Sequence, residues 1–302
     1  MKLPTKVKIV EMGPRDGLQN EAKAVSMDSK VELIDRLTEN GFRFIEVGSF
    51  VSPKWIPQMA DTAKVMETIK RKEEVVYSVL VPNIKGFDAA VAAKANEVAI
   101  FGAASETFSK KNINCSIEES LTRFKPVCDA AKNLDIPIRG YVSTVLDCPY
   151  EGPILPQDTA QVARILYEMG CHEISLGDTI GRGTPRRAQA MVEAVAKDIP
   201  IERIALHFHD TYGQALANIL ACMELGVSVI DSSVAGLGGC PYARGASGNV
   251  ATEDVLYMLR GLNCETGVEL EDVLDTSVFI SEVLGQPPAS KVGRISSELR
   301  SA

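Results

Sequence analysis

The stretch Ile201–Ser233, which reads IERIALHFHDTYGQALANILACMELGVSVIDSS, contains the pattern that decides the fold. Apolar residues alternate over Arg203–His209 and recur with helical spacing over Ala215–Glu224, and a second β-branched run follows at Ser228–Ser232. Gly226 stands just before that second run, at a position where a helix ends in a left-handed residue and glycine costs least. The stretch is therefore predicted to form one strand–helix–strand unit.

The same alternation runs along the whole chain. Strands are expected at Val7–Met12, Phe42–Val47, Val75–Val81, Glu97–Phe101, Ile138–Val145, Glu173–Leu176, Arg203–His209 and Ser228–Ser232. Helices are expected at Lys30–Glu39, Asp61–Lys70, Phe87–Lys94, Ile117–Asn133, Thr159–Glu168, Arg186–Ala196, Ala215–Glu224 and Thr252–Leu262. Eight such units without a nucleotide-binding glycine motif favour an α/β fold, a TIM (β/α)8 barrel, over a doubly wound sheet.

We expect a single catalytic TIM-barrel domain over residues 1–302, with the barrel itself over about residues 7–262. The remaining residues, about 263–302, are predicted to form an additional C-terminal helical segment and a tail. Glu269–Leu284 has the pattern of an amphipathic helix, and Gly285–Pro288 begins a tail that we expect to be poorly ordered.

Composition excludes several classes of protein. A formal charge of −8 argues against sequence-independent nucleic-acid binding, which needs a basic face, and no apolar run has the length of a membrane helix. The seven cysteines include no C-x-x-C pair, which favours reduced thiols over a disulfide framework or a zinc knuckle. Met1–Val10 has no apolar segment typical of a secretion signal, so we expect a cytoplasmic protein.

Two of the three histidines, His207 and His209, give the clearest chemical signal. They lie two residues apart in one predicted strand, so both side chains point to the same side of the sheet. Leu206 and Phe208 occupy the alternate, helix-facing side, which leaves the histidines inside the barrel. A metal site explains this pair, and the alternative is a pair of hydrogen-bonded core histidines. His172 opens a strand and is interpreted as structural.

A carboxylate and an amide are available to complete such a metal site. Asp16 follows the first predicted strand and Asn249 follows the eighth, and these two strand ends are neighbours in a closed barrel. Asp, Asn and two His side chains together favour Mg²⁺ or Mn²⁺, although two imidazoles also admit Co²⁺ or Zn²⁺.

Cys240 lies in a glycine-rich stretch, Gly236–Asn249, whose backbone can move and approach a ligand closely. We interpret this stretch as a flexible active-site loop. Its thiol is a candidate proton donor, base or nucleophile. The other six cysteines occur in helices, strand starts or ordinary loops and are interpreted as small buried apolar residues.

Further candidates follow the ends of the predicted strands, where TIM barrels carry their chemistry. Arg15 can bind a carboxylate or stabilise an enolate oxygen, and a surface salt bridge is its alternative role. Glu46 and Asp178 end strands and would be costly to bury unpaired. The remaining candidates for substrate contact are Gln19, Lys110, Lys111 and Asn112, and the loop Ser52–Gln58 with Trp55 is either a lid or simple packing.

Three segments together resemble the 3-hydroxy-3-methylglutaryl-CoA (HMG-CoA) lyase family: Gly13–Glu21, Glu46–Trp55 and Val234–Asp254. The Arg-Asp-Gly at residues 15–17 is shared with a wider superfamily that includes isopropylmalate and homocitrate synthases. The loop Gly236–Asn249 is particular to the lyases.

The resemblance implies a role for each matching residue. It implies that Asp16, His207, His209 and Asn249 bind the metal, and that Cys240, Arg15, His207, Glu46 and Asp178 are catalytic. It also implies an acyl-CoA substrate and a homodimer. The absence of a presequence and of a peroxisomal C-terminus suggests a bacterial cytosolic form.

The implied reaction is the cleavage of HMG-CoA to acetoacetate and acetyl-CoA, a metal-assisted retro-Claisen step. Arg15 is expected to stabilise the enolate oxygen, Cys240 and His207 to handle the protons, and Glu46 and Asp178 to orient Arg15 and the metal ligands. Three alternatives stay open: a lyase for another 3-hydroxyacyl-CoA, a Claisen-type acyltransferase, and a non-catalytic barrel that binds CoA esters.

Overall fold

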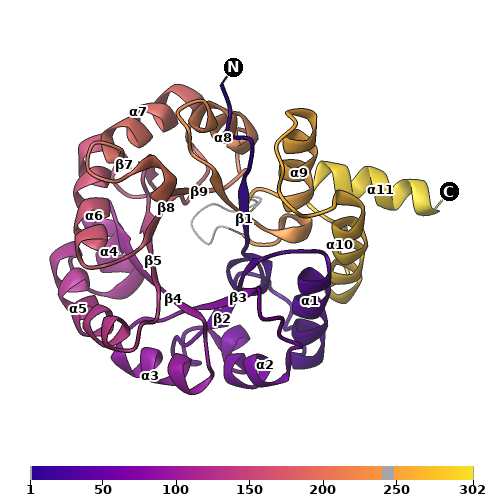
Figure 1. The fold of residues 1–302 in the computed structure, drawn as a ribbon, viewed down its shortest axis with the longest axis horizontal. Coiled ribbons are helices and arrows are strands. Elements are labelled where there is room, and N and C mark those ends of the chain that lie inside the picture. The colour runs from indigo at the N-terminus through magenta and orange to yellow at the C-terminus, as the bar shows by residue number, and fades with distance from the viewer. Residues whose placement is uncertain (1, 240–247, 302) are drawn as a thin grey trace.

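The computed structural model describes residues 2–239 and 248–301. Within them, eight parallel strands close into a barrel (Figure 1). Around the ring the strands are β1 (Lys8–Glu11), β10 (Val229–Ser232), β9 (Ile204–Phe208), β8 (Glu173–Asp178), β5 (Ile138–Ser143), β4 (Glu97–Ala103), β3 (Val76–Leu80) and β2 (Phe44–Ser49). β1 also pairs with β2, with Glu11 opposite Ile45, and this pairing closes the ring. The predicted TIM barrel is confirmed.

Helices surround the strands (Figure 1). They are α1 (Met27–Glu39), α2 (Thr62–Thr68), α3 (Ile84–Ala92), α4 (Glu106–Ile113), α5 (Ile117–Asn133), α6 (Pro156–Glu168), α7 (Pro185–Val195), α8 (Ala215–Met223), α9 (Thr252–Gly261), α10 (Leu270–Leu284) and α11 (Lys291–Ser301). Gly226 adopts a φ of +105° between α8 and β10, as its position in the sequence predicts.

The main hydrophobic core lies between the barrel and the helices, because alternate strand residues point outward. Ile204, Leu206 and Phe208 of β9 are buried in this layer. The barrel interior holds a second, smaller apolar cluster with Val10, Met12 and Tyr141 among its members. It also holds charged side chains, which are costly to bury unless they are paired.

The C-terminal segment differs from the prediction at one point. The predicted helix over Glu269–Leu284 is confirmed as α10, but the following residues form a further helix, α11, in place of a poorly ordered tail. Asp254 of α9 explains this order, because its carboxylate accepts hydrogen bonds from the backbone amides of Lys291 and Val292 at 3.1 and 2.9 Å. A carboxylate at a helix N-terminus satisfies amides that have no partner within the helix.

The structure also contains elements that the sequence patterns do not predict. β4 is followed directly by α4, where Ser105 Oγ accepts a hydrogen bond from the amide of Phe108 at 3.0 Å and begins the helix. A short antiparallel hairpin, β6 (Asp147–Cys148) with β7 (Gly152–Pro153), follows β5. Among the described residues, no helix has the length and apolar character needed to cross a membrane.

Candidate active site

A tight turn after β1, residues Gly13–Gly17, presents two charged side chains at the carboxyl ends of the strands. Glycine is required at both ends of this turn. A Cβ atom at Gly13 would lie 2.7 Å from Glu11 Oε1, and one at Gly17 would lie 2.7 Å from Leu237 Cβ. The turn therefore packs closely against its neighbours and fixes Arg15 and Asp16.

Arg15 is a buried cation held between two carboxylates, so its predicted alternative as a surface salt bridge is wrong. Its Nε donates to Glu46 Oε1, and its Nη1 donates to Asp16 Oδ1 at 2.5 Å. Burial disfavours the charged guanidinium, but the attraction of Glu46 and Asp16 outweighs burial and raises the pKa of Arg15. The guanidinium therefore stays charged at the mouth of the barrel.

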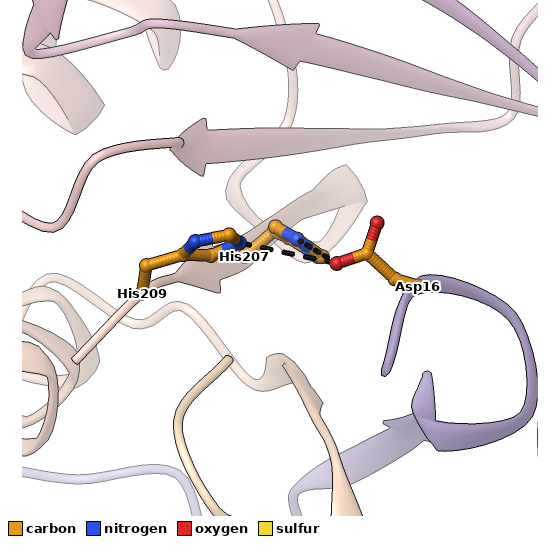
Figure 2. Close-up of side chains that lie close together, drawn as sticks. All are labelled: Asp16, His207 and His209. Atoms are coloured by element: carbon orange, nitrogen blue, oxygen red, sulfur yellow. Dashed lines mark ion pairs between the residues drawn. The ribbon is translucent and has the colours of Figure 1, made fainter. Parts of the chain in front are cut away.

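Asp16 and the two histidines form a compact group of possible metal ligands (Figure 2). Asp16 Oδ2 lies 3.7 Å from His207 Nε2 and 3.9 Å from His209 Nε2. One ligand atom from each residue lies within 4.8 Å of the others. A carboxylate and two imidazoles converging on one point are a donor set that fits a divalent cation.

Asn249 lies beside this group. Its Nδ2 donates to Asp16 Oδ2 at 2.9 Å and to the carbonyl oxygen of Leu237 at 3.3 Å. A bridge between His209 and Asn249 brings the two backbones together. The sequence therefore predicted correctly that the ends of the first and eighth strands meet.

The two imidazoles differ in their electrostatic environment. Burial lowers the pKa of His207, but hydrogen bonds to Asp16 and Asp231 more than compensate and raise it to about 9. Burial, with the neighbouring His207 as second cause, lowers the pKa of His209 to about 4. His209 is therefore neutral near pH 7, as a metal-binding imidazole must be.

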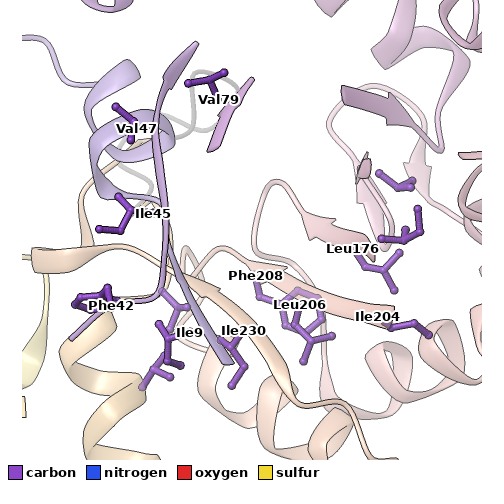
Figure 3. Close-up of a cluster of buried hydrophobic side chains, with 14 of the residues drawn as sticks. Ile9, Phe42, Ile45, Val47, Val79, Leu176, Ile204, Leu206, Phe208 and Ile230 are labelled. Atoms are coloured by element: carbon purple, nitrogen blue, oxygen red, sulfur yellow. The ribbon is translucent and has the colours of Figure 1, made fainter. Parts of the chain in front are cut away.

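Asp178 is directed away from this group. Side chains alternate along β8, and Asp178 lies on the same side of the strand as Leu176. Leu176 packs with Leu206 and Phe208 in the outer layer (Figure 3). The Asp178 carboxylate accepts hydrogen bonds from the amides of Arg182 and Gly183 at 3.2 and 2.7 Å. Neither contact reaches Arg15 or the candidate metal ligands, so the predicted orienting role of Asp178 has no direct contact behind it.

The candidates for substrate contact are more dispersed. Lys110, Lys111 and Asn112 lie on α4, where the Lys110 side chain is 64% exposed and Lys111 Nζ lies 5.3 Å from the centre of the Tyr150 ring. Gln19 follows the Gly13–Gly17 turn, and its buried Oε1 has no hydrogen-bond partner among the described atoms. Trp55 is 81% exposed. Gln58 of the same loop hydrogen-bonds to Val25 and Leu18, so the loop packs on the fold while the Trp55 side chain does not.

Cys240 lies outside the described residues, but both stems of its loop are described. Gly238 and Gly248 approach so closely that a Cβ atom at Gly248 would lie 2.3 Å from the carbonyl carbon of Gly238. A Cβ atom at Gly238 would in turn lie 3.1 Å from Asn249 Nδ2. The loop therefore begins and ends beside the candidate metal ligands.

Several buried polar side chains are not singled out by the sequence patterns, among them Glu11, Tyr141, Asp231 and Glu253. Glu11 accepts hydrogen bonds from the amides of Gly13 and Val234 and from Thr252 Oγ1. Tyr141 donates to Glu46 Oε2 at 2.5 Å. A charged residue inside a predicted strand is the signal that points to Glu11 and Asp231, since a buried charge needs a partner.

Comparison with known proteins assigns the family. A family model described as HMGL-like matches residues 6–280. A mitochondrial hydroxymethylglutaryl-CoA lyase from Gallus gallus is 60% identical over 98% of this chain and 99% of its own length. The chain belongs to the hydroxymethylglutaryl-CoA lyase family.

Two solved structures of hydroxymethylglutaryl-CoA lyases share the fold over 97% or more of this chain. The crystal structure of the lyase from Pseudomonas aeruginosa is 54% identical, has a TM-score of 0.97, and covers 100% of both chains. An HMG-CoA lyase from Acinetobacter baumannii, solved in complex with coenzyme A and 3-methylmalate, is 35% identical with a TM-score of 0.92 over 97% of this chain and 96% of its own. The resemblance seen in the sequence motifs is confirmed.

Proposed function

We infer that this chain is a carbon–carbon lyase that cleaves HMG-CoA to acetoacetate and acetyl-CoA, as its family implies. We propose that the reaction takes place at the mouth of the barrel beside Arg15, Asp16, His207 and His209. The observation that carries this proposal is the convergence of Asp16 with both histidines, next to a buried arginine, at the carboxyl ends of the strands.

We propose that Asp16, His207, His209 and Asn249 hold a divalent ion, and that Mg²⁺ or Mn²⁺ is the native one. Asn249 would bind through its amide oxygen, whereas its nitrogen now donates to Asp16. When bound there, the ion supplies Lewis-acid stabilisation of negative charge on the substrate oxygens. The oxygen ligands of Asp16 and Asn249 support Mg²⁺ or Mn²⁺, because these ions prefer hard donors.

The reaction needs two proton transfers and a place for negative charge. The C3 hydroxyl loses its proton, its oxygen becomes the new carbonyl, and the C2–C3 bonding electrons pass into the thioester enolate of acetyl-CoA. We assign stabilisation of that enolate oxygen to Arg15, whose orientation Glu46 fixes. We assign the proton transfer that ends on the enolate carbon to Cys240. Both ring nitrogens of His207 are committed, Nδ1 to Asp231 and Nε2 to the proposed ion, so we do not assign it the role in proton transfer that the sequence predicted.

The test is acetoacetate formation from HMG-CoA by chelated enzyme, with and without restored Mg²⁺ or Mn²⁺. Cys240→Ala is expected to lower turnover by about 10²–10⁴-fold, the usual contribution of a general acid or base. Cys264→Ala is the matched control, because Cys264 lies next to Pro4 near the opposite end of β1. Equal turnover by the Cys240→Ala and Cys264→Ala variants would remove Cys240 from the mechanism.

We also propose that residues 1–302 form one domain that acts as a homodimer. The packing of α10 against α1 and of α11 against α9 supports a single folding unit that includes the C-terminal helices. Analytical ultracentrifugation tests the dimer, and a single cooperative unfolding transition tests the single domain. A monomer at micromolar concentration contradicts the first proposal, and two separate transitions contradict the second.

We propose a cytoplasmic location. The cysteines that the structure describes are all free and buried, which supports a reducing compartment. Fractionation of the source cells, with detection of the chain by antibody, tests this proposal. Recovery of the chain outside the cytoplasmic fraction would contradict it.

A further inference from the structure

Asp231 of β10 lies inside the barrel, directly beneath the candidate metal ligands, and its carboxylate is fully buried. This carboxylate accepts hydrogen bonds from side chains on three other strands. Arg139 of β5 donates to it from Nη1 at 2.9 Å and from Nη2 at 2.6 Å, and Ser175 of β8 donates from Oγ at 2.8 Å. The fourth contact, 3.2 Å long, joins Asp231 Oδ2 to Nδ1 of His207 on β9.

We propose that Asp231 is a positioning residue that fixes the tautomer and ring orientation of His207 for metal binding. A neutral imidazole carries one N–H, and an ionised carboxylate only accepts hydrogen bonds. The contact with Asp231 therefore places the proton on Nδ1. The lone pair is then on Nε2, the atom that lies 3.7 Å from Asp16 Oδ2. Carboxylates that hold metal-binding histidines in this way are common second partners of metal sites.

Arg139 keeps Asp231 ionised, which is the state in which a carboxylate only accepts hydrogen bonds. Its two terminal nitrogens both donate to Asp231, and this paired geometry favours the carboxylate over the carboxylic acid. Arg139 Nε donates to Glu173 Oε1 at 2.7 Å, and Lys8 Nζ donates to Glu173 Oε2 at 2.6 Å. The two buried carboxylates are therefore balanced by two cations, so Asp231 can accept from His207 without taking its proton.

His209 provides an internal comparison, because no described residue holds its Nδ1 as Asp231 holds that of His207. Its Nδ1 is buried and has no hydrogen-bond partner among the described atoms. The two histidines face the same carboxylate oxygen, yet among the described residues only His207 has a carboxylate that fixes its tautomer. Loss of Asp231 should therefore change the tautomer of His207 and leave the tautomer of His209 unchanged.

This inference rests on the proposed metal site, so the experiment separates the two. The first measurement is the ¹⁵N NMR spectrum of the histidine side chains in metal-free protein at a pH where His207 is neutral, and His207→Gln identifies the His207 signals. Wild type should show His207 with its proton on Nδ1, and Asp231→Asn should show a mixture of tautomers. An unchanged His207 tautomer in folded Asp231→Asn would overturn the inference.

The second measurement is the dissociation constant for Mn²⁺, followed by electron paramagnetic resonance. Asp231→Asn should raise it by about 10–100-fold, the usual effect of losing such a partner. Ser175→Ala is the matched control, because it removes a hydrogen bond from the same carboxylate without touching His207, and it should change the constant by less than about 3-fold. Equal Mn²⁺ affinity in wild type and Asp231→Asn would overturn the inference.

If Asp231→Asn does not fold, the double variant with Arg139→Gln removes the buried cation that has lost one of its two carboxylate partners, and it takes the place of the single variant in both measurements. If wild type binds no Mn²⁺, the proposed metal site fails and the metal-binding role of Asp231 fails with it. The NMR measurement then still decides whether Asp231 fixes the tautomer of His207.

Discussion

Arg15 and Glu46, 31 residues apart in the chain, form a buried ion pair that joins the turn after β1 to the interior face of β2. Tyr141 donates to the second carboxylate oxygen of Glu46. Arg15 also holds Asp16 through Oδ1, which leaves Oδ2 directed at the histidines. Arg15, the proposed enolate-stabilising group, is therefore held by Glu46 and in turn contacts Asp16, a proposed metal ligand.

The first prediction concerns Glu46→Gln. The variant leaves the Arg15 cation without one of its two carboxylate partners, and breaking a buried pair in this way usually lowers the free energy of unfolding by about 3–5 kcal/mol. We expect kcat to fall by at least about 10-fold, because the guanidinium loses the contact that aligns it. Mn²⁺ affinity should change little, since Glu46 makes no contact with the candidate ligands other than through Arg15.

Tyr141→Phe is the control for Glu46→Gln. It removes one hydrogen bond from the same carboxylate and keeps the charge. Its free energy of unfolding and kcat should fall less than those of Glu46→Gln. Steady-state kinetics and urea unfolding check both variants, and a Glu46→Gln enzyme with wild-type kcat would contradict the role of this pair.

The second prediction concerns the stems of the loop that carries Cys240. Gly248→Ala forces a Cβ atom into the backbone of Gly238, so one of the two stems must move. We expect a loss of stability of about 1–3 kcal/mol and a fall in turnover, because the loop moves relative to Asn249. Gly261→Ala is the matched control, since a Cβ atom there meets nothing within 4 Å, and it should be neutral or slightly stabilising. Equal turnover by these two variants would sink the prediction.

Much of this architecture could be predicted from the sequence, because strand alternation and helix-ending glycines are local signals. The pattern around His207 and Phe208 gave the correct inner and outer faces of β9. The same logic failed for Asp178, because β8 continues two residues beyond its expected end and the side chain falls on the helix-facing side. When a strand is predicted two residues too short, its last side chains are expected in a loop. In the structure they still alternate between the two sides of the sheet.

The network around Asp231 illustrates what local patterns miss. Arg139, Ser175 and His207 come from three different strands, and nothing in the spacing of these residues along the chain reveals that they share one carboxylate. The closed barrel brings them together. Helix α11 was missed for a similar reason, since its N-terminus is held by Asp254, a residue of another helix.

The third prediction follows from Glu253, which is fully buried in α9 and accepts hydrogen bonds from the amide of Ala235. Burial raises the pKa of its carboxyl group to about 8 from its ordinary 4.5. The folded protein therefore keeps a proton that the unfolded chain has already released. This contribution to stability is fully present below about pH 4.5 and is lost as the pH rises through about 8.

Glu253→Gln should remove this pH dependence, because glutamine stays neutral. The free energy of unfolding of wild type should fall more steeply than that of Glu253→Gln as the pH rises, by up to about 1.4 kcal/mol per pH unit. Glu282→Gln, a change at an exposed residue of α10, is the control. Urea unfolding at a series of pH values measures all three proteins, and parallel curves for wild type and Glu253→Gln would rule out a buried neutral carboxyl group.

The fourth prediction separates Asp178 from the candidate metal ligands. Asp178→Ala leaves the amides of Arg182 and Gly183 without their acceptor, which should lower the free energy of unfolding by about 1–3 kcal/mol. Turnover should fall because the loop after β8 changes, while Mn²⁺ affinity stays at the wild-type value. Asp16→Asn is the comparison and should lose Mn²⁺ binding. Equal loss of Mn²⁺ in both variants would place Asp178 in the metal site.

The most direct test measures bound Mn²⁺ and acetoacetate formation from HMG-CoA in the same preparations of wild type and His209→Ala. We expect wild type to lose turnover on chelation and to regain it as one ion per chain is restored. His209→Ala, folded by circular dichroism, should lose ion binding and turnover together. Full turnover by chelated wild type, or unchanged ion binding by His209→Ala, would contradict a metal-assisted cleavage at Asp16, His207 and His209.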